Sequence, residues 1–114
     1  MVFKYNEKDL LNDINTICEG NINLKDSISV KNNFFISYCK YYELFRLQSL
    51  ERIRRIYGTY KNNPEDKTII INLIKKLFYQ IWDGAYSELC VYDFLNNCLE
   101  HPCKIQLDDP ENIK

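Results

Sequence analysis

Two long stretches of helical periodicity dominate this sequence and limit the folds open to it. Across residues 30–57 apolar side chains recur at intervals of three and four residues, and across residues 69–99 they do so on more than one side. The segment Asn-Pro-Glu-Asp at 63–66 separates the two. It is a strong helix start, because asparagine is a good N-cap, proline is well tolerated at the first helical position, and acidic side chains are favourable near the positive end of the helix dipole.

These signals predict an all-α fold, a long antiparallel helical hairpin with a short N-terminal helix over residues 7–19. We expect Gly58 and the pair Asn62–Asn63 to close the first long helix, which is about 30 residues in length. The second should run from Pro64 to His101, where the following proline ends it, and Gly84 should bend it.

Composition and the ends of the chain narrow the architecture further. Three glycines and three prolines in 114 residues are too few for a turn-rich all-β domain. We expect one helical domain over residues 1–102 and a C-terminal tail over 103–114, in which residues 103–107 alternate as a short strand would. No apolar run approaches the ~18 residues that a membrane span needs, so we expect no membrane association.

Charge is unevenly distributed along a chain whose net charge is −1. Residues 40–61 carry six basic and two acidic side chains, whereas residues 62–114 carry five basic and nine acidic ones. One interpretation is complementarity between two packed helices or two subunits. The other is a local site for phosphate groups.

The basic segment follows a cluster of aromatic residues, and this order has two interpretations. Aromatic rings stack on bases and arginines hold phosphates, so the segment 40–61 is a candidate for binding nucleic acid. Alternatively, the aromatics fill a helix interface, and we then expect a few of them to carry binding energy. The nucleic-acid candidates are Arg46, Arg52, Arg54 and Arg55, and the interaction candidates are Phe34, Tyr38, Tyr42, Phe45 and Trp82.

The five cysteines, an odd number without a secretory signal before them, predict reduced thiols in a cytoplasmic protein. Cys98, His101 and Cys103 have side chains that suit zinc, but their spacing is irregular and Pro102 lies between two of them. We expect buried thiols at a helix end and no metal. The three glycines are isolated, so no phosphate-binding loop is present and we expect no cofactor.

Glu88 lies on an otherwise apolar row of the second long helix. Burying a carboxylate is costly unless it is paired or hydrogen-bonded. We expect an arginine of the first long helix to pair with it. The alternative is that Glu88 points into a site completed by another segment.

The residues around Glu88 also carry a motif, Gly-Ala-x-x-Glu-Leu followed by a leucine six positions later, within Trp82-Asp83-Gly84-Ala85-Tyr86-Ser87-Glu88-Leu89-Cys90-Val91-Tyr92-Asp93-Phe94-Leu95. Residues 78–107 thereby resemble the first helix of PD-(D/E)XK (restriction-endonuclease-like) nucleases and the start of the strand that follows it. The resemblance implies that Glu88 leans toward a metal site and that residues 103–107 begin the first core strand.

The rest of the nuclease pattern is missing from this sequence. No Pro-Asp followed by a strand with (Asp/Glu)-x-Lys occurs, so the carboxylates that would bind catalytic metal have no counterpart. The resemblance therefore implies an N-terminal piece of a longer nuclease, or a degenerate relative, which does not cut nucleic acid by itself.

Taken together, the sequence predicts a non-catalytic helical module for protein interaction or oligomerisation inside the cell, part of or associated with a defence nuclease. Two long helices leave apolar surface that a chain of this size cannot cover, so a protein partner or a second copy is expected. A nucleic-acid-binding domain and a small inhibitor of a host or phage enzyme are the alternatives.

Overall fold

The computed structural model describes residues 5–22, 33–79 and 82–98. Within these ranges it confirms the all-α fold and contains no strand. The elements are α1 (Glu7–Ile17), α3 (Phe34–Tyr41), α4 (Glu43–Tyr60), α5 (Pro64–Lys76), α6 (Trp82–Asp93) and a single π-helical turn η1 (Phe94–Cys98). The strand-like residues 103–107, the His101–Pro102 helix end and the rest of the tail lie outside the described residues.

The short N-terminal helix is confirmed. The Asn6 side chain accepts a hydrogen bond from the Asp9 backbone N–H, and the Asp9 carboxylate accepts one from the Asn6 backbone N–H, which makes a capping box. Leu10 and Ile14 are buried on its inner face. After Cys18 the chain reverses through Glu19 and Gly20, which both have positive φ.

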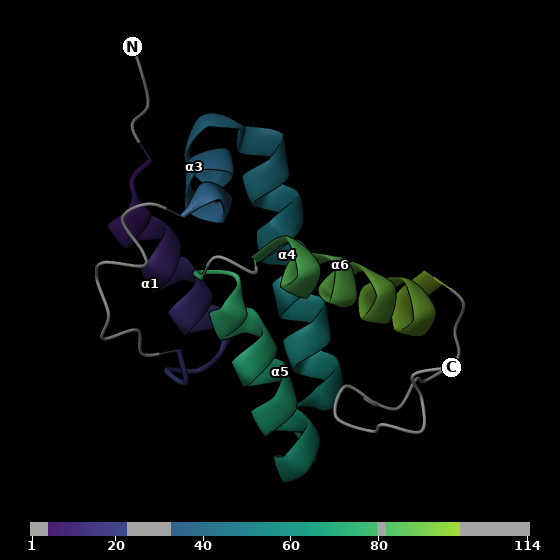
Figure 1. Cartoon of the computed structure of the whole chain (residues 1–114). Coiled ribbons are helices and arrows are strands. Elements are labelled where there is room, and N and C mark those ends of the chain that lie inside the picture. The colour runs from purple at the N-terminus through teal and green to yellow at the C-terminus, as the bar shows by residue number, and fades with distance from the viewer. Residues whose placement is uncertain (1–4, 23–32, 80–81, 99–114) are drawn as a thin grey trace.

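The α4–α5 hairpin is also present. Asn63 accepts hydrogen bonds from the backbone N–H groups of Glu65 and Asp66, and Pro64 is the first helical residue, as the sequence predicts. Figure 1 shows α4 and α5 side by side, joined by the short turn at their ends.

The prediction of one unbroken first helix is wrong, because the chain turns a sharp corner at Tyr42 (Figure 1). Tyr42 has an extended backbone, with φ −121° and ψ 98°, and is both the C-cap of α3 and the N-cap of α4. Neither proline nor glycine causes this corner. Arg46 donates a hydrogen bond of 3.3 Å to the Cys39 carbonyl, one of those that the end of α3 leaves without a helical partner.

The second long helix is broken as well, and not at the residue expected. The helix stops before Leu77, which begins a turn that the structure describes as far as Tyr79, whereas Gly84 lies inside α6. The buried Asn33 side chain donates hydrogen bonds to the carbonyls of Leu77 (2.9 Å) and Tyr79 (3.2 Å). Contacts with a distant asparagine thus stabilise the carbonyls that the end of α5 exposes.

Both corners bring the helices of the described residues around one core. α6 crosses α4 and also contacts α5, while α1 and α3 cover the other side (Figure 1). The largest fully buried side chains are Phe35, Phe78, Leu10, Ile14, Ile53, Ile56, Ile70, Leu73, Ile74, Leu77, Leu89 and Cys18. In the described part of the chain, no helix combines the length and the hydropathy that crossing a membrane would require.

Candidate interaction surface

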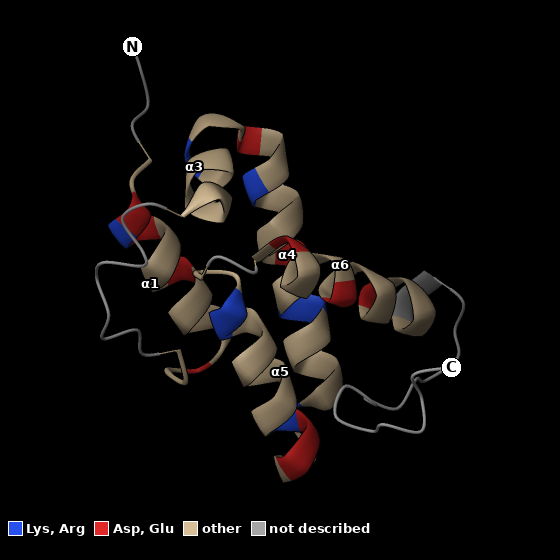
Figure 2. Cartoon of the chain, viewed as in Figure 1, with Lys and Arg blue, Asp and Glu red and all other residues tan. Residues whose placement is uncertain are grey.

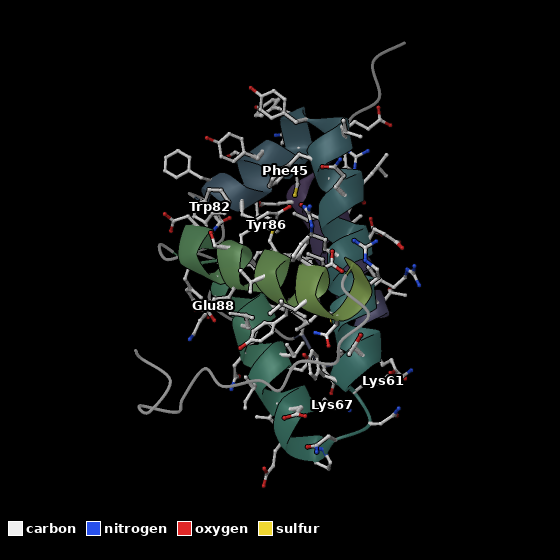
Figure 3. The ribbon with its side chains drawn as sticks, turned by 90° about the vertical axis from the view of Figure 1, so that its right-hand side faces the viewer. Phe45, Lys61, Lys67, Trp82, Tyr86 and Glu88 are labelled. Atoms are coloured by element: carbon white, nitrogen blue, oxygen red, sulfur yellow. The ribbon has the colours of Figure 1, made fainter. Side chains whose placement is uncertain are left out.

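Exposed apolar side chains concentrate at the corner between α3 and α4. We call this group the aromatic tip; its members are Phe34, Tyr38, Tyr41, Tyr42, Leu44 and Leu47, with exposed fractions from 42% for Tyr38 to 73% for Tyr41. Single exposed apolar residues are ordinary on protein surfaces, but a contiguous group marks a binding site more often than chance. Figure 3 shows rings projecting from this end of the molecule, above the labelled Phe45 and Trp82.

The helical period explains why these side chains face outward. Phe34, Tyr38 and Tyr41 are spaced by four and three residues and share one face of α3, while Phe35 and Cys39 occupy the inner face and are completely buried. The corner at Tyr42 then starts α4 with Leu44 and Leu47 outside. The tip therefore consists of the outer face of α3 and the first two turns of α4.

A connected set of rings joins the aromatic tip to the core. The Tyr38 ring centroid lies 5.9 Å from that of Tyr42, 5.9 Å from that of Phe45 and 5.7 Å from that of Trp82. Phe45 in turn stacks on Tyr86 at 5.3 Å. The structure thus brings together four of the five aromatic residues that the sequence singled out, and the fifth, Phe34, is on the same face of α3 as Tyr38.

Hydrogen bonds hold the floor of this aromatic cluster in place. The Tyr86 hydroxyl lies 3.0 Å from the Ser49 hydroxyl and accepts a 3.0 Å hydrogen bond from Arg52. Phe45, Trp82 and Tyr86 are half-buried against the core. Rings positioned this firmly lose little conformational entropy when a partner covers them, which favours binding.

The four arginines proposed for nucleic acid all have partners within the chain. Arg46 is buried, lies 4.1 Å from the centroid of the Tyr5 ring and forms an ion pair of 3.8 Å with Glu43. Arg54 forms two hydrogen bonds with Glu51 on the outer surface of α4. Arg54 also lowers the pKa of the Glu51 carboxyl by hydrogen bonding to it.

The remaining two arginines join α4 to α6. Arg55 binds both carboxylate oxygens of Asp93 at 2.7 Å, and Arg52 lies 3.5 Å from the same group. Asp93 is only 6% exposed. Two arginines of the basic segment are therefore matched by an acid of the C-terminal third within one molecule, and Figure 2 shows the acidic positions of α6 where it crosses α4.

Sequence reasoning missed Asp93. It interrupts the apolar pattern of α6 as Glu88 does, and its only other signal is the run of basic residues across the hairpin. Glu88 is half-buried and lies on the side of α6 that faces α5 (Figure 3). The ion pairs of Arg52 and Arg55 with α6 are formed with Asp93.

A shallow groove of about 360 Å³ adjoins the aromatic tip along the outer side of α4. Leu47 belongs to both the tip and the groove, and the groove is lined by Leu47, Gln48, Glu51, Arg52 and Arg55. Its charges are already matched by Glu51 and Asp93, so it offers an apolar and hydrogen-bonding surface more than a concentrated positive field.

The described residues do not include a group of three His, Cys, Asp or Glu side chains placed to hold a metal ion. The side chain of Cys98, and all of His101 and Cys103, lie outside them. Burial raises the pKa of the Cys18 and Cys39 thiols to about 12, so both remain protonated and chemically inert. They act as small apolar side chains of the core.

No protein-family model, curated protein or solved structure matches this chain. The helix that the nuclease resemblance implies coincides with α6, and the strand that should follow it lies outside the described residues. The resemblance stays a prediction, and any functional inference depends on the geometry of the aromatic tip.

Proposed function

We propose that this chain is a non-catalytic helical module that binds another protein surface through the aromatic tip. One observation carries the proposal: six large apolar side chains within residues 34–47 are exposed together on a floor of half-buried rings. Tyrosine and tryptophan are enriched among the residues that contribute most to binding between proteins. Burying such a group releases roughly 25 cal/mol for each Å² of apolar area.

The experiment compares association of the wild-type chain with that of a polar tip variant, Tyr41→Ser with Leu44→Ser. Both side chains point outward, so the variant should fold with unchanged stability and lose its association, whether with itself in light scattering or with a protein co-purified from the source cell. The matched control, Val91→Ser with Phe94→Ser, removes two similarly exposed apolar side chains from α6 and η1. Equal association of both variants and the wild type contradicts the proposal.

Binding of single-stranded nucleic acid is a second candidate function, because the tip also presents tyrosines that can stack on bases. The Lys40 ammonium lies 5.4 Å from the centroid of the Tyr41 ring, and both side chains are exposed. Such binding would weaken steeply with added salt and would depend on Lys40. Neutralising the arginines Arg52 and Arg55 would instead disturb the contact between α4 and α6.

A further inference from the structure

We propose that the partner of the aromatic tip is a second copy of this chain, related to the first by a twofold axis through the corner at Tyr42. This inference rests on the proposed function and names its partner. A twofold interface uses the same surface on both copies, so each residue of that surface must be compatible with its counterpart under the rotation.

The charges of the tip satisfy this condition. Among residues 34–48 the charged side chains are Lys40, Glu43 and Arg46, and Arg46 is buried. The exposed pair, Lys40 and Glu43, has opposite signs and lies on either side of the corner, so these two exposed charges cancel.

A rotation about the corner places Lys40 of one copy opposite Glu43 of the other, and the same pair then forms a second time. The Glu43 carboxylate is available for it, because its side chain is 77% exposed and its contact with Arg46 is long, at 3.8 Å. Tyr41 and Tyr42, between the two charges, would meet their own counterparts at the axis, where offset or edge-on ring pairs are favourable.

The size of the tip sets the expected strength of the dimer. Specific interfaces usually involve about 20–30 residues on each side, and the tip with its floor is smaller. We therefore expect a reversible dimer with a dissociation constant in the micromolar range or weaker. It should be visible as a mass that rises with concentration toward twice the 13.7 kDa of one chain.

The test is a charge exchange followed by sedimentation equilibrium of the full chain. Lys40→Glu and Glu43→Lys should each weaken the dimer about tenfold, because each turns two attractive contacts into two repulsive ones. Mixing the two variants should restore association, and so should the double exchange in one chain. Added salt should reduce all of these differences.

Lys76→Glu and Glu65→Lys make the same changes of charge at exposed positions on α5. They serve as controls and should leave the dimer unchanged. A dimer that neither Lys40→Glu nor Glu43→Lys weakens overturns the inference. So does a wild-type chain that remains monomeric at every concentration.

The outcomes also separate this inference from the proposed function. If the chain is monomeric and the tip variant loses binding to a different protein, the twofold dimer is overturned but the interaction module stands. If the chain is monomeric and the variant loses binding to nucleic acid or lipid vesicles, both proposals are overturned. Association that persists unchanged in Tyr41→Ser with Leu44→Ser overturns both.

Discussion

The two halves of α4 differ in how far their leucine and isoleucine side chains are exposed to solvent. In the first half Leu44 and Leu47 are 68% and 52% exposed, whereas in the second half Ile53 and Ile56 are almost completely buried. The second half is enclosed on several sides, for example by the contact of Tyr57 with Asn21 after α1. Among the described residues, most of the large exposed apolar side chains therefore lie at one end of the molecule, in the aromatic tip, and Val91 and Phe94 are exposed elsewhere.

The largest expected effect separates two neighbouring phenylalanines of α3. Phe35 is fully buried, and its ring contacts those of Phe45, Phe78, Trp82 and Tyr86, so Phe35→Ala should cost about 3–5 kcal/mol of unfolding free energy. Phe34 is 66% exposed, and Phe34→Ala should change stability by less than about 0.5 kcal/mol. Urea denaturation measures both, and similar losses would show that the tip is part of the core.

The next effect concerns how the second half of α4 is held. Asp93→Asn removes the charge that binds Arg55 and Arg52, and we expect a loss of about 2 kcal/mol, because both arginines keep partial access to water. Glu51→Gln, the matched change in an exposed ion pair with Arg54, should leave the unfolding midpoint almost unchanged. Equal midpoints for the two variants would mean that the contact between α4 and α6 contributes little.

The dependence of the unfolding free energy on pH above 9 tests whether the inner face of α3 is as inaccessible to water as the rest of the core. Burial raises the pKa of Cys39 from 9.0 to about 12. The folded state therefore retains a proton that the unfolded state loses, and stability falls as pH rises above 9. The difference in unfolding free energy between wild type and Cys39→Ala should shrink by up to about 1.4 kcal/mol per pH unit; parallel curves would contradict it.

The smallest effect concerns a glycine in the second half of α4. Gly58 is exposed, helical and has open space where a Cβ would lie, so Gly58→Ala should raise stability by about 0.5–1 kcal/mol. Gly20 also has open space, but its φ of +84° suits glycine, and Gly20→Ala should be destabilising. Thermal unfolding of the two variants should therefore show shifts of opposite sign.

Much of the fold follows from local signals in the sequence. The caps at Asn6 and Asn63, the proline after the second cap and the helical period predict the class of fold and the α4–α5 hairpin. Local signals of this kind act within a few residues, so they report helix ends that the chain itself encodes nearby.

The two corners could not be predicted because the contacts that stabilise them form only in the folded chain. Nothing near Tyr42 breaks a helix by propensity, and the hydrogen bond from Arg46 to the Cys39 carbonyl becomes visible only once α3 and α4 are folded together. A wide apolar pattern predicts burial on several sides of one straight helix. The same pattern also fits two short helices that bury one side and expose the other.

The aromatic tip was therefore predicted in part. The sequence grouped Tyr38, Tyr42, Phe45 and Trp82, and the structure places them in contact. It could not distinguish the exposed rings from those of the floor, because that division depends on the direction of the corner. Asp93 was missed because a single acid on a helix does not reveal which arginine it meets.

The hydrogen bonds of Asn33 have a consequence for the order in which the ribosome synthesises the groups that form the corner between α5 and α6. This side chain binds the carbonyls of residues 44 and 46 positions later in the chain. The Asn33 amide, which donates these hydrogen bonds to the corner between α5 and α6, is thus synthesised well before the residues of the corner. Because Asn33 precedes Leu77 in the chain, the donor of both hydrogen bonds is already present in the nascent chain when their acceptors are made.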